Sequence, residues 1–284
     1  MVLMIIAMLA VLGLCFGSFV NALVWRVHEQ AARKKAGKSA QAQDGLSVTH
    51  GRSMCPNCRH KLKALDMVPM LSWLALRGKC RYCGKPISAQ YPLVELLTAL
   101  LFVVLYIWWP VAFTDAQTVI FALWLALATG FMALIVSDLR WMLLPDRILY
   151  PTTAVAAVIA VIAAATASQP WLAVLNTLLA VAVGGGLFYA LFQVSKGKWI
   201  GGGDVKLGWM LGLVTATPAR SGLMIFLAAL LGTLVSIPLL LSGRMKRHSV
   251  IPFGPFLIMA AIVVQLFGHD ILSWYRDTFL STVL

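Results

Sequence analysis

Charged residues are scarce in this chain: Asp, Glu, Lys and Arg together make up 12% of its 284 residues, whereas hydrophobic residues make up 61%. A water-soluble domain carries a larger charged fraction, so this composition excludes that class. Apolar runs of about 20 residues recur along the sequence, and this length crosses a bilayer core of about 30 Å. The sequence therefore predicts an all-α polytopic membrane protein.

The first apolar run, Val2 to Val24, lacks both the basic segment and the small-residue cleavage site of a signal peptide. We therefore expect it to be retained as the first transmembrane helix. About eight spans are expected, near residues 2–25, 91–109, 117–136, 150–167, 172–194, 205–219, 222–242 and 252–269. This pattern predicts a first helix over 1–25, a soluble loop domain over 26–90 and a transmembrane body over 91–284.

Acidic residues are few, 10 against 23 Lys and Arg, and the basic residues are unevenly spread. Thirteen of the 23 fall between Arg26 and Lys85, so the positive-inside rule places this insert in the cytoplasm. With eight spans and both termini outside, the other cytoplasmic loops carry Arg140, Arg147, Lys196, Lys198, Arg244, Lys246 and Arg247. The opposite loops carry almost only Arg220 and Arg276. Anionic lipid headgroups, rather than nucleic acid, are the expected neighbours of this charge.

Cysteine is also scarce, but four of the five residues form two C-x2-C pairs in the insert. The pattern C-x2-C-x21-C-x2-C is close to that of a zinc ribbon, in which two turns present four thiolates to one structural ion. Two disulfides or four unrelated thiols are the alternatives, and a reducing cytoplasm disfavours disulfides. The expected zinc ligands are Cys55, Cys58, Cys80 and Cys83. We expect His50 and His60 to be surface residues, and Cys15 to be a packing residue in the first span.

Two aspartates fall at the cytoplasmic ends of separate predicted spans. Asp138 ends the third span in "IVSDLRWMLLPDRILYP", and Asp204 opens the sixth in "SKGKWIGGGDVKLGWMLG". Taken singly, Asp138 and Asp146 could be helix-end charges, and Asp204 a helix N-cap behind a glycine hinge. Taken together, two carboxylates at one depth supply what aspartyl acid–base hydrolysis requires. The glycines would leave room for a substrate backbone.

Several ordered blocks resemble the type IV prepilin peptidases, and the resemblance covers nearly the whole chain. The blocks are "FGSFVNALVWR", the "CPNC" and "CRYC" loop, "SDLRWMLLPDRILYP", "GGGDVKLGWMLG" and "IPFGPFL". The resemblance implies an aspartic endopeptidase of the GxGD type. By position, Asp138 and Asp204 correspond to its catalytic aspartates, and Gly201 and Gly203 to its motif glycines. Asp146, eight residues past Asp138, is the rival aspartate and is assigned a supporting role.

The resemblance also implies the reaction and its place. The family removes the short basic leader of prepilins and pseudopilins after a glycine, at the cytoplasmic face of the bacterial inner membrane. It then methylates the new N-terminal residue with S-adenosylmethionine, for type IV pilus or type II secretion assembly. No glycine-rich nucleotide fingerprint follows a predicted strand here. We therefore expect the cofactor near "ALRGKC" and the following span, with Gly78 and Glu95 as candidate residues.

Two other classes of protein fit part of the sequence. A transporter could use paired acidic residues, but no internal repeat is visible and the aspartates fall at one face rather than at the midplane. A membrane-anchored zinc-ribbon binding module would need one span and no aspartate pair. The segment Glu29–Gly51 has low complexity and is expected to be flexible.

Overall fold

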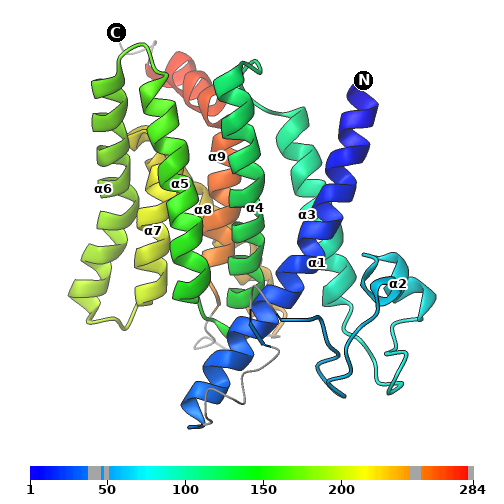
Figure 1. Cartoon of the computed structure of the whole chain (residues 1–284). Helices are drawn as coiled ribbons and strands as arrows, with labels where there is room; N and C mark the ends of the chain where they lie inside the picture. Colours follow the sequence, from blue (N-terminus) through cyan, green and yellow to red (C-terminus); the bar gives the residue numbers. More distant parts are fainter. Residues whose placement is uncertain (38–45, 48–50, 244–250, 281–284) are drawn as a thin grey trace. The chain divides into compact units, whose positions relative to one another are not determined.

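The computed structural model describes residues 1–37, 46–47, 51–243 and 251–280 (Figure 1). Two compact units divide the chain, one of residues 1–107 and 128–136, the other of residues 108–127 and 137–284. In the described residues the elements are all helical, apart from two isolated β-bridges. They are α1 (Val2–Lys35), η2 (Ala64–Met67), α2 (Leu71–Ala75), α3 (Gln90–Ile107), α4 (Asp115–Trp141), α5 (Asp146–Ala165), α6 (Pro170–Ser195), α7 (Gly202–Thr215), α8 (Pro218–Leu241), α9 (Gly254–Tyr275) and η3 (Arg276–Leu280).

The expected all-α polytopic architecture is confirmed, with one helix shorter than a full span. Seven helices in the described part of the chain are long and apolar enough to cross a membrane. The eighth apolar helix, α7, has 14 residues, which at 1.5 Å per residue gives a length of about 21 Å. It begins within the glycine run, at Gly202, and ends before Ala216, whose backbone is left-handed with φ 59°. Backbone geometry at both ends therefore sets its length.

The first helix is longer than the sequence indicates. It continues to Lys35, ten residues past the end expected at 25, and its 34 residues extend for about 51 Å. Two buried polar side chains in this extension bind later parts of the chain: Gln30 donates to the Leu46 carbonyl at 2.7 Å, and Arg26 donates to the Gly51 carbonyl at 2.9 Å. These bonds support the helix beyond its apolar part.

The segment expected to be flexible therefore begins as helix, from Glu29 to Lys35. Some sequence expectations fall outside the described residues. They concern residues 38–45 and 48–50 with His50, and the basic loop with Arg244, Lys246 and Arg247.

In the first unit, α1 packs closely on α3 through a seam of small residues. A Cβ at Gly13 would lie 2.5 Å from the Cα of Ala99, and one at Gly17 would lie 2.5 Å from the Cα of Glu95. One further turn along, the Asn21 side chain donates to a backbone carbonyl of α3 at 3.1 Å. Glycines four residues apart let two membrane helices approach closely. This seam joins α1 to the helix that follows the soluble loop.

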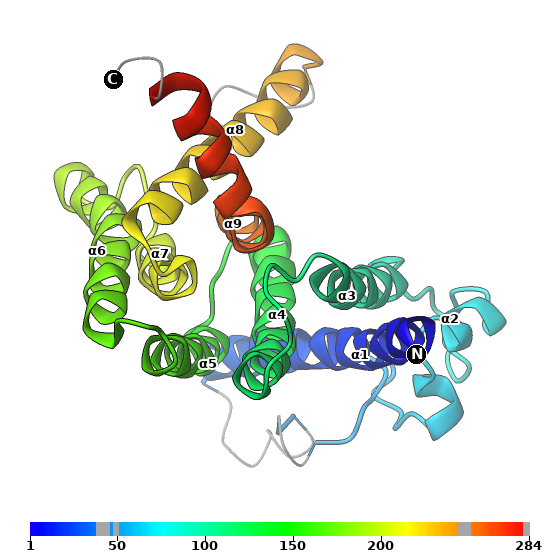
Figure 2. The ribbon, with the colours of Figure 1, turned by 90° about the horizontal axis from the view of Figure 1, so that it is seen from above.

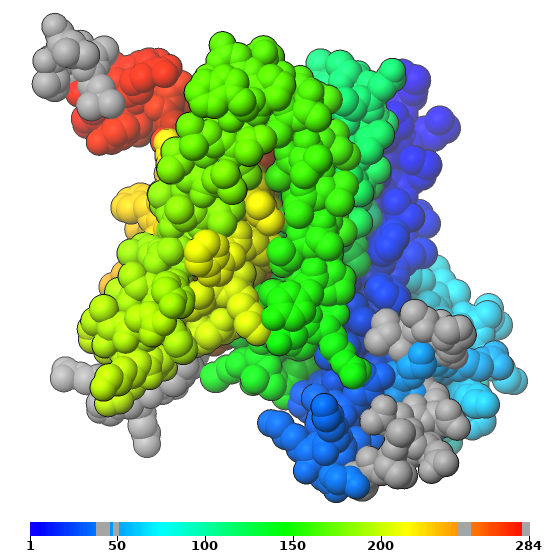
Figure 3. All heavy atoms as spheres, turned by 60° about the vertical axis from the view of Figure 1, so that its left-hand side comes forward, coloured from blue at the N-terminus to red at the C-terminus, as the bar shows by residue number. Residues whose placement is uncertain are grey.

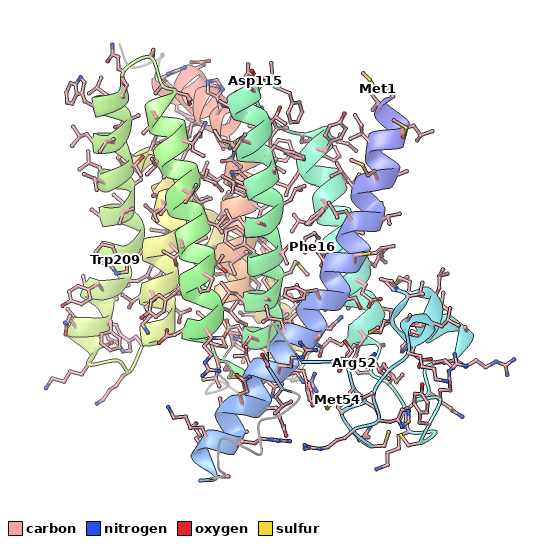
Figure 4. All side chains as sticks on the ribbon, in the orientation of Figure 1. Met1, Phe16, Arg52, Met54, Asp115 and Trp209 are labelled. Atoms are coloured by element: carbon pink, nitrogen blue, oxygen red, sulfur yellow. The ribbon has the colours of Figure 1, made fainter. Side chains whose placement is uncertain are left out.

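Cys15 is exposed, and the packing role expected for it is therefore wrong. The glycine seam of α1 faces α3, and the helical period places position 15 on a different side of the helix from Gly13 and Gly17. Phe16 does contact α3, with its ring centroid 5.9 Å from that of Phe102 (Figure 4).

In the second unit, α7 contacts α5, α6, α8 and α9, and Figure 2 shows it among these helices. Its side chains appear between α5 and α6 in Figure 3. A second glycine seam brings it against α6: a Cβ at Gly208 would lie 2.7 Å from the Gly184 carbonyl oxygen, and one at Gly212 would lie 2.5 Å from the Cα of Val181. The α7 backbone is therefore held at a fixed position beside α6.

Candidate active site and metal site

Asp138 lies in the last turn of α4 and is buried, with 6% of the residue exposed. The helix ends at Met142, whose left-handed backbone (φ 52°) lets its N–H donate to the Asp138 carbonyl at 2.8 Å. The Ser137 hydroxyl fixes the following turn by donating to the Leu143 carbonyl at 2.8 Å. Asp115 marks the opposite end of α4 (Figure 4). Asp138 is thus held at one end of its helix.

Asp204 lies in the first turn of α7, three residues after the N-cap. The capping residue is Gly201, with an extended backbone (φ −74°, ψ 149°), and not Asp204 itself. The Gly201 N–H faces the Asp204 carboxylate. The positive end of the α7 dipole also stabilises a negative charge in this turn.

The two carboxylates belong to one cluster within the second unit. The Asp204 charge acts electrostatically on Asp138, so the groups lie close enough to repel one another. The α4–α5 connection contacts the glycine run, because a Cβ at Gly203 would lie 3.3 Å from the Cβ of Leu144. Gly254, the first residue of α9, lies against the Asp138 side chain. In Figure 1 these ends of α4, α7 and α9 all point downwards.

Asp146 begins α5 and makes an ion pair. Its Oδ1 lies 2.6 Å from Nζ of Lys206, and that ammonium lies 5.5 Å from the ring centroid of Tyr150. The Asp146 and Lys206 side chains are 52% and 43% exposed. This pairing was not foreseen from the sequence, since Asp146 and Lys206 are 60 residues apart and carry no shared motif.

This cluster has the parts that acid–base hydrolysis needs. Asp138 and Asp204 are two carboxylates, the charge of Asp204 acts on Asp138, and each carboxylate has a backbone N–H facing it. Gly201 and Gly202 are exposed beside the pair, and a Cβ at Gly201 would lie only 3.4 Å from Oδ2 of Asp204. Because these glycines have no side chain, an extended peptide can approach the carboxylates.

The four cysteines of the soluble loop also come together, within the first unit. Their sulfur atoms all lie within 4.8 Å of one another, and all five cysteines of the chain are free thiols. Four sulfurs bound 2.3 Å from one tetrahedral zinc would be about 3.8 Å apart, so a small inward movement would complete such a site. The cluster therefore suits a structural metal ion, and it contains no disulfide.

Each cysteine pair opens a tight turn that directs backbone N–H groups at the sulfurs. The turns are closed by the bridges Met54–Lys61 and Lys79–Pro86, and Met54 is labelled in Figure 4. Burial raises the pKa of the Cys55 thiol, to about 11. Burial acts in the same direction on the pKa of Cys80, but the N–H groups of the second turn and the Cys55 thiol outweigh it, and the pKa is about 7. The pKa values of these two neighbouring thiols are thus shifted in opposite directions.

Asp66 braces the two turns against each other. Its carboxylate, on a side chain only 4% exposed, accepts from Arg81 Nε at 2.7 Å, Tyr82 Oη at 2.8 Å and the Lys63 N–H at 3.2 Å. Lys63 follows the first turn, whereas Arg81 and Tyr82 belong to the second. His60 is exposed, as expected, and its ring stacks on Tyr82 with centroids 3.7 Å apart. Sequence reasoning missed this brace because its members have no common spacing.

The two candidate cofactor residues, Gly78 and Glu95, lie in the first unit, Gly78 within the loop and Glu95 in α3. Gly78 has φ +68° and lies under the Trp73 ring, where a Cβ would be 3.0 Å from Cζ2. Glu95 is buried in α3, and its Oε2 accepts from the Met70 N–H at 2.7 Å. Ser18 of α1 also faces the Glu95 carboxylate. Glu95 thus joins α3 to the loop, whereas Gly78 has a structural role within the loop.

The fold and these sites together define a polytopic membrane protein that carries a carboxylate pair and a four-thiol loop. Residues 11–109 match a family model described as the bacterial peptidase A24 N-terminal domain, and residues 119–237 match the type IV leader peptidase family. The chain belongs to the type IV leader peptidase family, as its sequence blocks indicated. The two matched regions contain the four cysteines and the three aspartates Asp138, Asp146 and Asp204 respectively.

Curated relatives have one recurring name, prepilin leader peptidase/N-methyltransferase. The protein of that name from Aeromonas hydrophila is 32% identical over 282 residues, covering 94% of this chain and 92% of the relative. The protein of that name from Bacillus subtilis is 33% identical, covering 81% of this chain and 87% of the relative. The one from Burkholderia pseudomallei is 34% identical, covering 93% of this chain and 85% of the relative. No solved structure matches this chain.

Proposed function

We propose that this chain is a membrane aspartic endopeptidase that removes the short basic leader of prepilins or pseudopilins after a glycine. The observation that carries this proposal is the pairing of Asp138 and Asp204 beside exposed backbone glycines. The names of the relatives support the substrate class. Type IV pilus or type II secretion assembly is the process that would use the product.

The proposed chemistry divides the two carboxylates between base and acid. The ionised one takes a proton from water while the hydroxide oxygen bonds to the scissile carbonyl carbon. The protonated one gives its proton to the amide nitrogen as the C–N bond breaks, and the proton taken from water restores the pair. Asp204, in the first turn of α7, suits the ionised role, and Asp138, in the last turn of α4, suits the protonated role.

The proposed orientation follows from charge. The insert carries thirteen of the 23 Lys and Arg residues, which supports a cytoplasmic loop and periplasmic termini in the bacterial inner membrane. A prepilin would then place its apolar helix in the bilayer and its basic leader in the cytoplasm. Its scissile bond would lie at the interface, level with the ends of α4 and α7. Lipids are the expected surroundings of the seven long apolar helices.

We also propose zinc as the metal and methylation as a second reaction. The ligands would be Cys55, Cys58, Cys80 and Cys83, and a closed four-thiolate sphere supports a structural role for the ion. The names of the relatives support N-methylation of the new N-terminal residue, with S-adenosylmethionine as the methyl donor. We propose that the donor binds near Gly78 and Glu95. Unchanged methylation after Gly78→Ala and after Glu95→Gln would remove these residues from the cofactor site.

Cleavage of a purified prepilin, followed by the loss of leader mass on a gel, tests the peptidase proposal. Asp138→Asn and Asp204→Asn should each abolish cleavage, because one carboxylate cannot serve as both acid and base. Asp270→Asn is the matched control, since Asp270 is an exposed carboxylate at the far end of α9 and should tolerate the change. Normal cleavage by either of the first two variants would exclude that aspartate from the catalytic role.

A further inference from the structure

The start of α9 lies against the Asp138 side chain, and neither family model reaches this region. Gly254 is the first residue of α9, after the N-cap Phe253, and both Gly254 and Asp138 are buried. A Cβ built on Gly254 would lie 2.6 Å from Oδ2 of Asp138 and 3.5 Å from Cδ2 of Leu207. The first of these distances is shorter than Cβ contacts in real structures. Any larger residue would therefore have to displace the carboxyl group.

The same helix start presents a donor to the carboxyl group. The backbone N–H of Gly254 faces Asp138, whereas Oδ2 has no completed hydrogen bond in the described part of the chain. The first N–H groups of a helix have no partner within the helix, so this donor is available. A buried oxygen without a hydrogen bond destabilises the folded state. A small movement of α9 towards Asp138 would let the Gly254 N–H donate to Oδ2 and remove that cost.

A donor at Oδ2 also decides where a proton can reside. An N–H can donate only to an oxygen that does not itself point a proton at it. With Gly254 donating to Oδ2, the proton of a neutral Asp138 is carried by Oδ1. The helix start would thereby fix the rotation of the carboxyl group and leave one oxygen for proton transfer.

We propose that Gly254 is a positioning residue of the active site: its backbone N–H holds Oδ2 of Asp138, and its missing side chain leaves the space that this oxygen occupies. This inference rests on the proposed function in taking Asp138 as catalytic. It adds a third element, the start of α9, to the ends of α4 and α7. It also gives a physical reason for a glycine in "IPFGPFL".

The test uses Gly254→Ala in the full-length protein, with Gly232→Ala as matched control. Gly232 lies in α8, and a Cβ there would lie 3.6 Å from Phe256 Cδ2 in the first turn of α9, an ordinary contact. Both variants thus add one methyl group beside the same turn. For Gly254→Ala we expect kcat for prepilin cleavage to fall by at least about tenfold with KM within about twofold, since the substrate-binding surface is unaltered. Gly232→Ala should leave both constants within about twofold of the parent.

A second variant separates the donor from the steric effect. Glycolic acid incorporated at position 254 by cell-free translation replaces the N–H with an oxygen and adds no side chain. We expect kcat to fall by roughly 10- to 100-fold, as when one preorganised donor is lost. A parent-like kcat in both variants would overturn the proposal.

The infrared band of the Asp138 carboxyl, assigned by its loss in Asp138→Asn, provides a readout that does not depend on cleavage. Loss of the donor should move this band in the glycolate variant, and an unmoved band would overturn the proposed hydrogen bond. If the parent protein is folded, retains its metal and cleaves no prepilin, the proposed function fails, and the band still decides the inference.

Discussion

Replacing Gly208 by alanine should slow cleavage although the residue is buried against α6 and bears no catalytic group. A Cβ at this position would lie 2.7 Å from the Gly184 carbonyl oxygen and 2.7 Å from Phe188 Cδ2. Ordinary contact begins at 3.4 Å, so α7 must move from α6 by about 0.7 Å at this point. Asp204 is one turn, about 6 Å, before Gly208 on the same short helix and would move with it.

The size of the effect follows from this displacement. A misplacement of about 1 Å at a catalytic group can cost about 100-fold in rate. A movement of about 0.7 Å should therefore lower kcat by roughly 10- to 100-fold, or about 1.4 to 2.7 kcal/mol in activation free energy. Initial rates of prepilin cleavage in detergent or proteoliposomes give kcat and KM for the comparison.

Gly186→Ala is the control for this prediction. Gly186 lies in α6 two residues after Gly184, and a Cβ there would meet nothing within 4 Å. Both variants replace a glycine inside a helix by alanine and so gain the same helix propensity. Only Gly208→Ala displaces α7. If Gly208→Ala cleaves as fast as Gly186→Ala, the glycine seam does not position Asp204 and the reasoning is refuted.

The remaining predictions concern the four-cysteine loop and the exposed ion pair of Asp146 and Lys206. Chelation or Cys58→Ser should release the metal and lower the temperature at which the loop unfolds. Asp66→Asn should weaken metal affinity by roughly 10- to 100-fold, because the hydrogen bonds that hold the two cysteine turns together are lost. Metal content and a competitive zinc dye measure both effects, and unchanged affinity in Asp66→Asn would argue against the brace. Asp146→Asn or Lys206→Ala should lower the free energy of unfolding by less than about 1 kcal/mol, because the pair is exposed. A loss of cleavage in Asp146→Asn as complete as in Asp204→Asn would instead make Asp146 a catalytic candidate.

Local chemistry was predictable where it depended on residues close together in sequence. The pairs Cys55–Cys58 and Cys80–Cys83 each form one turn, so their spacing alone indicated a four-thiol cluster, and the structure brings the sulfurs within 4.8 Å. Apolar runs of near-membrane length likewise located the long helices to within several residues. Errors arose at helix ends, such as the ten additional residues of α1, where Arg26 and Gln30 bind distant carbonyls.

Contacts between distant segments were not predictable, since no local pattern encodes them. The sequence contains Asp138 and Gly254, but no pattern in it indicates that these residues, more than a hundred positions apart, are in contact. The Lys206–Asp146 pair and the Asp66 brace likewise join residues that share no local sequence pattern.

By itself, the sequence determined a polytopic helical protein, a four-cysteine loop and two aspartates at the ends of separate apolar helices. Composition, periodicity and short motifs predict these features because each feature depends on residues that are close together in the sequence. Only the tertiary structure decided that Asp138 and Asp204 lie near one another, that Asp204 follows a glycine N-cap, and that the start of α9 contacts Asp138. The first and third of these relations join helices far apart in the sequence, and such contacts exist only once the helices have packed.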